Sequence, residues 1–116
     1  MIDRNLMVIL LDYYGKLLSD KQYKTMISYY YDDLSLNEIA DNQGISKQAV
    51  SVSIKRAEDK IMGFEQELKM YEKTNKLKNR LLAISEELDE LSTDCDGREI
   101  IMKASNDIRD LANKIN

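Results

Sequence analysis

The sequence contains no histidine, no proline, no tryptophan and only one cysteine. The missing histidines exclude serine and cysteine triads built on imidazole, and they exclude most zinc sites. A single cysteine cannot form an internal disulfide, which is typical of a protein in a reducing compartment. Proline breaks helices, so its absence from a chain rich in leucine, isoleucine, lysine and glutamate predicts long uninterrupted helices.

Long apolar runs are also missing. The longest, residues 6–11, has six residues, whereas a membrane-spanning helix needs about 20. The N-terminus lacks a basic segment followed by a longer apolar stretch, so we expect no export signal. With 43% hydrophobic and 33% charged residues in 116, the composition predicts a globular, cytoplasmic protein with no membrane span.

The charge is negative overall but unevenly distributed. The net charge is −4, and an acidic chain is a poor general candidate for nucleic-acid binding. Residues 46–80, however, carry nine basic and five acidic side chains, which makes this segment +4. Residues 1–45 carry −3 and residues 81–116 carry −5. The middle of the chain is therefore the part best suited to bind a polyanion.

Residues suited to cap helix N-termini divide the first part of the chain. In two places the cap is followed three residues later by glutamine or glutamate, which is the spacing of a capping box. In the last helix of this part, apolar side chains recur at alternating four- and three-residue spacing as far as Tyr71. The expected helices are 4–18, 20–31, 36–42 and 47–71, which follow Asp3, Ser19, Ser35 and Ser46.

The second part of the chain begins after a break in this pattern. The apolar spacing fails at residues 72–75, where we expect a connection between helices. Two further helical stripes follow at residues 77–91 and 101–115, with a turn expected at residues 93–97. Because no segment alternates apolar and polar residues, the sequence predicts an all-α fold without strands.

The segment SLNEIADNQGISKQAVSVSI, residues 35–54, has the pattern of a helix-turn-helix. Ala40 is small enough to let two helices cross closely, and Gly44 supplies the positive φ of a sharp turn. We expect a single domain, residues 1–116, without a wing. Its core would be residues 3–75, including the long recognition and linker helix, and residues 76–116 would form an acidic helical hairpin.

The outward side of the second helix carries polar side chains that suit a nucleic-acid groove. Glutamine can bond the edge of adenine, and lysine pairs with phosphate or guanine. A serine at the helix N-terminus can hold a phosphate beside exposed backbone N–H groups. The same pattern also fits plain helix packing, with a solvated outer face. The candidate nucleic-acid-binding residues are Ser46, Lys47, Gln48, Ser51, Lys55 and Arg56.

Three stretches resemble the bacterial YlxM family of small helix-turn-helix proteins. They are SDKQ (19–22), YYYDDLSLNEIADNQGISKQAVSVSIKRAEDKI (29–61) and FEQELKMY (64–71). The family's helix-turn-helix is itself similar to region four of sigma factors, which reads promoter DNA. The resemblance therefore implies a sigma region-four-like helix-turn-helix in this chain.

The resemblance further implies a nucleic-acid-binding regulator linked to the signal recognition particle, because family genes typically lie beside the gene for that particle's GTPase protein. Positions that match the family pattern include Ser46, Gln48, Lys55 and Arg56. Lys47 stands where the family often has arginine, and residues 51–53 replace a bulkier, more polar stretch. This change weakens the expectation of base reading more than that of phosphate contact.

Two functions from different classes remain open at this stage. In the first, the helix at residues 46–60 binds DNA or RNA, weakly and with a steep salt dependence because few cations are available. In the second, the chain is an adaptor without direct nucleic-acid binding. Its acidic hairpin would then dock on the signal recognition particle's GTPase protein or the receptor. We expect no enzyme activity, cofactor or metal site, since no nucleophile–base pair or ligand set is visible.

The apolar stripes also predict a homodimer. The wide apolar face of residues 6–18 and the heptads of residues 50–71 exceed what three short partner helices would cover. A two-fold dimer would present two recognition helices to adjacent half-sites.

Three other groups of residues invite weaker interpretations. The acidic cluster at residues 86–90 is expected to be a solvated helix face rather than a metal site. The tyrosines at 29–31 could stack on bases, but core packing is the more usual role of tyrosine at such spacing. Cys95 lies among acidic residues, which should raise its thiol pKa and disfavour a catalytic role.

Overall fold

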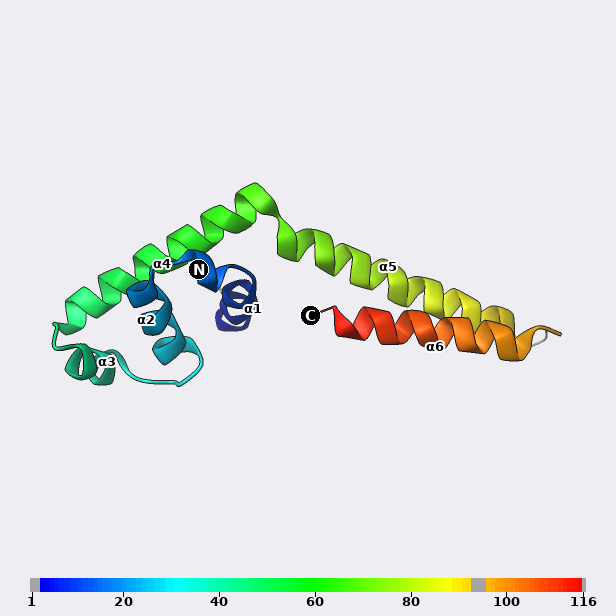
Figure 1. Cartoon of the computed structure of the whole chain (residues 1–116), viewed down its shortest axis with the longest axis horizontal. Helices are drawn as coiled ribbons and strands as arrows, with labels where there is room; N and C mark the ends of the chain where they lie inside the picture. Colours follow the sequence, from blue (N-terminus) through cyan, green and yellow to red (C-terminus); the bar gives the residue numbers. More distant parts are fainter. Residues whose placement is uncertain (1–2, 93–95, 116) are drawn as a thin grey trace. The chain divides into compact units, whose positions relative to one another are not determined.

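The computed structural model describes residues 3–92 and 96–115. No strand occurs in these residues, so the predicted all-α fold is confirmed. None of their helices is long and apolar enough to cross a membrane. The elements, in chain order, are α1 (Arg4–Tyr14), the 3-10 helix η1 (Gly15–Leu17), α2 (Asp20–Tyr30), α3 (Leu36–Gln43), α4 (Lys47–Leu68), α5 (Met70–Leu91) and α6 (Arg98–Lys114) (Figure 1).

The described chain divides into two compact units, one ending at Tyr71 and the other beginning at Glu72. The first unit contains α1 to α4 and therefore the predicted helix-turn-helix. The second contains α6 and nearly all of α5, and corresponds to the predicted hairpin. The expectation of one domain with an internal boundary at residue 75 stays a prediction.

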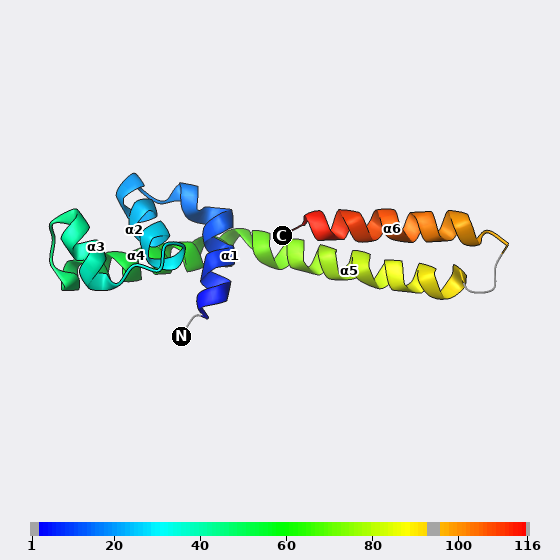
Figure 2. The same cartoon turned by 90° about the horizontal axis from the view of Figure 1, so that it is seen from below.

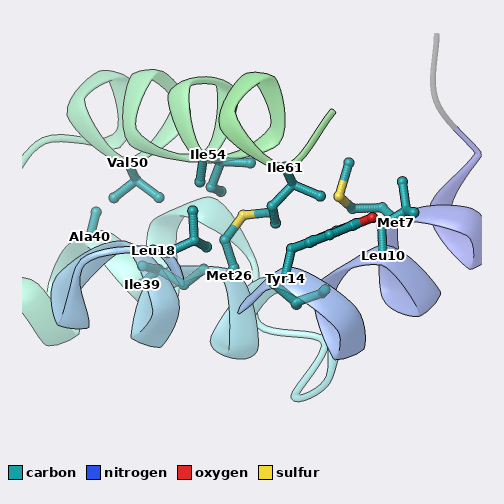
Figure 3. Packing of buried hydrophobic residues seen from close by; sticks show 12 residues of the cluster. Met7, Leu10, Tyr14, Leu18, Met26, Ile39, Ala40, Val50, Ile54 and Ile61 are labelled. Carbon is teal, nitrogen blue, oxygen red and sulfur yellow. The ribbon is translucent and has the colours of Figure 1, made fainter. Parts of the chain in front are cut away.

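The first unit is built on one face of α4. Its side chains at the predicted heptad positions Val50, Ile54, Ala57 and Ile61 are at most 5% exposed. Figure 3 shows the labelled members of this row pointing toward apolar side chains from the preceding helices. Those partners are Met7, Leu10, Leu11, Tyr14, Leu18, Met26, Ile39 and Ala40. The row on α4 is therefore the centre of the core.

This core changes the interpretation of the two apolar faces from which we expected a dimer. Most of the faces at residues 6–18 and 50–71 is covered within one chain, because α4 packs directly against α1, α2 and α3. Leu17 and Leu68 at the ends of these faces remain 56% and 47% exposed. The expected homodimer stays a prediction.

The helix N-termini confirm most of the predicted capping. At Ser19 and Ser35 both capping boxes form: each serine hydroxyl accepts the backbone N–H three residues on, and the side chain there accepts the serine N–H. Ser46 Oγ likewise accepts a backbone N–H at 3.0 Å. Asp3 occupies the N-cap position of α1 but makes no side-chain capping bond. Gly44 has the expected positive φ, +68°.

The first helix ends earlier than predicted. The α-helix stops at Tyr14, and Gly15–Leu17 form a 3-10 turn in place of α-helix up to residue 18. Gly15 is buried, and a Cβ at this position would lie 2.9 Å from Cε1 of Tyr23. The close approach of this ring from α2 requires the missing side chain, a long-range constraint that helical periodicity does not show.

The connection between the two long helices is also misplaced by the sequence pattern. Residues 72–75, expected to be a connection, are helical, and the break lies at Lys69 in the left-handed conformation (φ 53°, ψ 34°). The Tyr14 hydroxyl donates to Glu65 Oε1 at 2.6 Å and accepts the N–H of Met70 at 2.9 Å. Glu65 Oε1 accepts the next backbone N–H at 3.1 Å. These bonds satisfy N–H groups at the start of α5 and fix the break.

In the second unit, α5 and α6 lie side by side and antiparallel (Figures 1 and 2). Ser85 Oγ and Ser105 Oγ meet between them at 2.8 Å. The Ser105 hydroxyl donates to Asp89 Oδ1 at 2.5 Å, and Arg109 donates to Asp89 Oδ2 at 2.5 Å. The Ser105 hydrogen bond, followed by that from Arg109, lowers the pKa of Asp89. Cys95, in the predicted turn, lies outside the described residues.

Candidate nucleic-acid interface

The predicted helix-turn-helix forms from α3, the turn at Gly44 and the first turns of α4. Ile39 and Ala40 of α3 belong to the same buried cluster as Val50 and Ile54 of α4. Gly44 reverses the chain between the two helices in its left-handed conformation. One side of α4 is therefore held against the core, while its opposite side faces solvent.

A hydrogen-bonded threonine joins α3 to α2. Thr25 is only 1% exposed, and its hydroxyl accepts from Gln43 Nε2 at 2.8 Å. The same hydroxyl donates to the backbone carbonyl of Lys21 at 2.9 Å. The end of α3 is thus tied to the first turns of α2. Local sequence patterns do not indicate this contact, because its two residues are 18 positions apart in the chain.

The six predicted contact residues are all exposed, at the N-terminus and along the outward side of α4, and four of them line two different grooves. Gln48 and Arg56 line a cleft between α4 and the beginning of α2. Ser51 and Lys55 line a smaller groove on the other side of α4. The remaining two are the N-cap and the first residue of α4. The predicted site therefore stays a prediction, and the structure adds a groove on each side of its helix.

The cleft beside Arg56 is basic. It has a volume of about 580 Å³, and its lining side chains include three cations, Lys21, Arg56 and Lys60, and no carboxylate. Arg56 and Lys60 stand one helical turn apart on α4, and Lys21 comes from α2. Lys60 Nζ donates to Gln22 Oε1 at 3.3 Å, which holds the amine at the cleft. Three cations on one cleft create a local positive potential in a chain of net charge −4.

The smaller groove, toward α3, is less favourable to an anion. It has a volume of about 200 Å³ and is lined by Glu58 as well as by Lys55. Lys55 also forms an ion pair with Asp59 at 3.2 Å, with both side chains mostly exposed. Such a surface pair adds little stability, but its carboxylate offsets the lysine charge. The basic cleft is therefore the better candidate for phosphate contact.

Val52 lies on the exposed side of α4, at one of the positions where the family pattern is more polar. Its side chain is 48% exposed, although the rest of its helix face is polar. Val52 also lines the basic cleft together with Gln48. In a DNA groove, a small apolar side chain can contact the methyl group of thymine. An exposed valine at this position is thus compatible with base contact.

The tyrosines at 29–31 are held by contacts within the chain. The rings of Tyr29 and Tyr30 pack edge to face with centroids 5.0 Å apart, and the guanidinium of Arg4 lies 5.2 Å and 5.0 Å from their centroids. The Tyr31 hydroxyl donates to Asp12 Oδ1. These contacts favour the structural role over base stacking.

We expect Tyr30 and Tyr31 to ionise late. Burial, reinforced by Glu58, raises the pKa of Tyr30 to about 12, and burial with the Asp12 hydrogen bond raises the pKa of Tyr31 to about 12. Because these folded-state pKa values lie above the ordinary 10.0, the tyrosines stabilise the fold fully below pH 10, and this contribution is lost as the pH rises through 12. An ultraviolet titration of the native chain should show two tyrosines that ionise near pH 12.

The substitution Asp12→Asn provides the control for that titration. It should lower the pKa of Tyr31 and leave that of Tyr30 near 12, since only Tyr31 bonds to Asp12. If all tyrosines of the folded chain ionised together near pH 10, the burial of these two hydroxyls would be refuted.

The geometry agrees with a comparison against protein families. The model described as "Putative helix-turn-helix protein, YlxM / p13 like", UPF0122, matches residues 1–101. The chain belongs to the UPF0122 family. This confirms the resemblance found in the sequence, and the matched range includes the helix-turn-helix, the basic cleft and all of α5.

Individual UPF0122 proteins are similar over most of their length. A UPF0122 protein of Halalkalibacterium halodurans is 40% identical over 94 residues, which cover 80% of this chain and 86% of that protein. One from Malacoplasma penetrans is 42% identical over 74 residues, 64% of this chain and 69% of its own. One from Shouchella clausii is 47% identical over 74 residues, covering 63% and 68%. No solved structure matches the chain.

The structure adds two cations of this UPF0122 chain that the predicted site lacks. Lys60 could have been found from the sequence, because it follows Arg56 by four residues and so lies on the same helix face. Lys21 has no such local signal. It reaches the cleft only because α2 packs across α4. Its place in the SDKQ stretch of the family resemblance was the only indication in the sequence.

Proposed function

We propose that this protein binds double-stranded DNA, with the exposed side of α4 in the major groove and the basic cleft on the adjacent phosphates. The observation that carries the proposal is the position of Lys21, Arg56 and Lys60 on one cleft beside the outward face of a helix-turn-helix. DNA is favoured over double-stranded RNA because an α-helix fits the major groove of B-DNA, whereas that of A-form RNA is deep and narrow.

In this arrangement, phosphate contact provides most of the affinity. The three cleft cations are the groups suited to the backbone. In the cleft, the exposed side chains Gln48 and Val52 suit base edges, through bonds to adenine and contact with thymine methyl groups. With so few base-reading groups, the protein should discriminate only modestly between DNA sequences. Most of that discrimination should come from a preference for A·T pairs at the position that these side chains contact.

The salt dependence of binding tests the proposal. Neutralising three phosphates gives a slope of about −2.7 in a plot of log affinity against log salt, so affinity should fall roughly 40-fold between 50 and 200 mM. Fluorescence anisotropy with a labelled random-sequence duplex measures this slope. Absence of binding at the lowest salt concentration, or a slope near zero, would contradict the proposal.

A second candidate function is the alternative left open by the sequence, a protein adaptor that docks through its acidic hairpin. The supporting observation is the exposed acidic row Glu86, Glu87 and Glu90 on α5, in a segment of net charge −5. Replacement of all three by glutamine should weaken capture of the signal recognition particle's GTPase protein by the full chain. Unchanged capture would count against the adaptor. Loss of capture with unchanged DNA binding would favour it as a separate function.

A further inference from the structure

The C-terminal hairpin buries small polar residues and leaves large apolar ones in solvent. Within the described part of α5, α6 and their connection, the buried residues are Ser85, Ser92, Ser105 and Ala112. The largest exposed fractions among its apolar side chains are 53% to 78%, at Leu77, Leu91, Ile100 and Leu111. Helices in proteins owe most of their stability to packing of an apolar face, and the described residues of the hairpin leave these large apolar side chains more than half exposed.

One apolar row of each helix lies on a shared face of the hairpin. Ser85 and Ser105 mark the line where α5 and α6 touch. On α5 the row residues lie four and one positions before Ser85 and three and six positions after it, and on α6 they hold the same positions relative to Ser105. Each row is therefore rotated by the same angle about its helix from the line of contact. In an antiparallel pair, equal offsets place both rows on the same side. The rows are Leu81, Ile84, Leu88 and Leu91 on α5, and Ile101, Ala104, Ile108 and Leu111 on α6.

The charges of α5 are complementary to those of a second, antiparallel α5. Its first half, residues 70–80, has four cations and one acid, whereas its second half, residues 81–91, has four acids and no cation. Arg80 and Glu87 are seven residues apart, so they lie on the same face of the helix. Both are exposed and border the apolar row, each within three or four residues of Ile84.

We propose that the apolar face of α5 and α6 is covered by the same face of a second copy, which makes an antiparallel four-helix bundle with two-fold symmetry. Each α5 then lies against the other α5, with Arg80 of one copy opposite Glu87 of the other. Two-helix layers of this kind pair in four-helix bundles, and a two-fold interface must be complementary to itself. The charge reversal along α5 meets that requirement.

The size of the face is sufficient for such a dimer. A helix of 17 residues, the length of α6, is about 25 Å long, and two adjacent helices are about 20 Å wide. The footprint is therefore about 500 Å² on each copy, or about 1,000 Å² in total, the area that a specific interface needs. The predicted homodimer thus has a surface, on the hairpin in place of the buried stripes of the first unit.

Sedimentation equilibrium of the full chain tests this proposal. The wild type should be a dimer at micromolar concentration. Arg80→Glu alone and Glu87→Arg alone each place like charges opposite one another and should weaken the dimer at least tenfold. The double variant restores opposite charges and should return the dimerisation constant to within about threefold of the wild type.

The double variant makes the outcome specific. Rescue requires that the two residues face each other across the interface, and loss of folding cannot produce it. Lys103→Glu reverses an exposed charge outside the apolar row and is the matched control, expected to leave the dimer unchanged. A weak but specific interface should form a dimer at about 50 μM protein. A wild type that is still monomeric at this concentration would overturn the proposal. Equal dimerisation of all the variants would overturn it as well.

Discussion

Replacing Ile61 with alanine is expected to lower the free energy of unfolding of the first unit by about 2–5 kcal/mol. Ile61 is fully buried and lies beside Met26 and Tyr14 in the core (Figure 3). The loss combines the transfer of the removed methyl groups with the cavity that they leave between α4 and the preceding helices. The cavity should stay largely unfilled, because α4 is the centre of the first unit and the other helices pack against it.

Tyrosine fluorescence measures this change in the first unit alone. All seven tyrosines lie at or before residue 71, and the chain has no tryptophan, so the signal does not report the hairpin. Val52→Ala is the matched control on the same helix. Val52 is 48% exposed, and its truncation should change the free energy of unfolding by less than about 0.5 kcal/mol. Equal effects of the two variants would refute the placement of the core on α4.

Removing the cations of the basic cleft is expected to abolish most DNA binding. The triple variant of Lys21, Arg56 and Lys60 to alanine loses the three groups assigned to phosphate, so affinity for a duplex should fall roughly 100-fold at low salt. The slope of log affinity against log salt should approach zero in the same variant. All three residues are exposed, and the tyrosine signal should therefore show an unchanged fold.

The control variant removes the same number of charges elsewhere. Arg98, Lys103 and Lys114 are exposed on α6, and their replacement by alanine changes the net charge by the same amount. This variant should bind DNA with at least a third of the wild-type affinity. Equal loss in both triple variants would mean that the total charge, and not the cleft, determines binding.

Much of the fold could be predicted from local signals. The capping boxes at Ser19 and Ser35, the N-cap at Ser46 and the turn at Gly44 depend on residues within four positions of one another. Such interactions are specified by short sequence patterns. The buried row of α4 follows directly from its apolar spacing.

The errors come from contacts between distant residues. The break at Lys69 depends on the Tyr14 hydroxyl, 56 residues before the N–H of Met70 that it accepts. At the early end of α1, the ring of Tyr23 from α2 packs against Gly15, where a side chain would clash. Neither interaction changes the apolar periodicity, so the sequence pattern continues through both breaks.

The residues of the candidate site could be predicted only where they lie on a single helix. Arg56 and Gln48 are on α4, whose outward side the periodicity identifies. Lys21 belongs to another helix and requires the packing of α2 on α4. Lys55 and Arg56 line different grooves, and this too depends on the neighbouring helices, because α2 and α3 form the other walls.

The central claim is that α4 and the basic cleft contact DNA, and nuclear magnetic resonance tests it most directly. A titration of isotope-labelled protein with a short duplex should shift the backbone signals of Gln48, Val52, Arg56 and Lys21 first. Signals from the hairpin, such as Arg109, should change least. Shifts confined to the hairpin, or no shifts at low salt and at duplex concentrations in excess of the protein, would contradict the account.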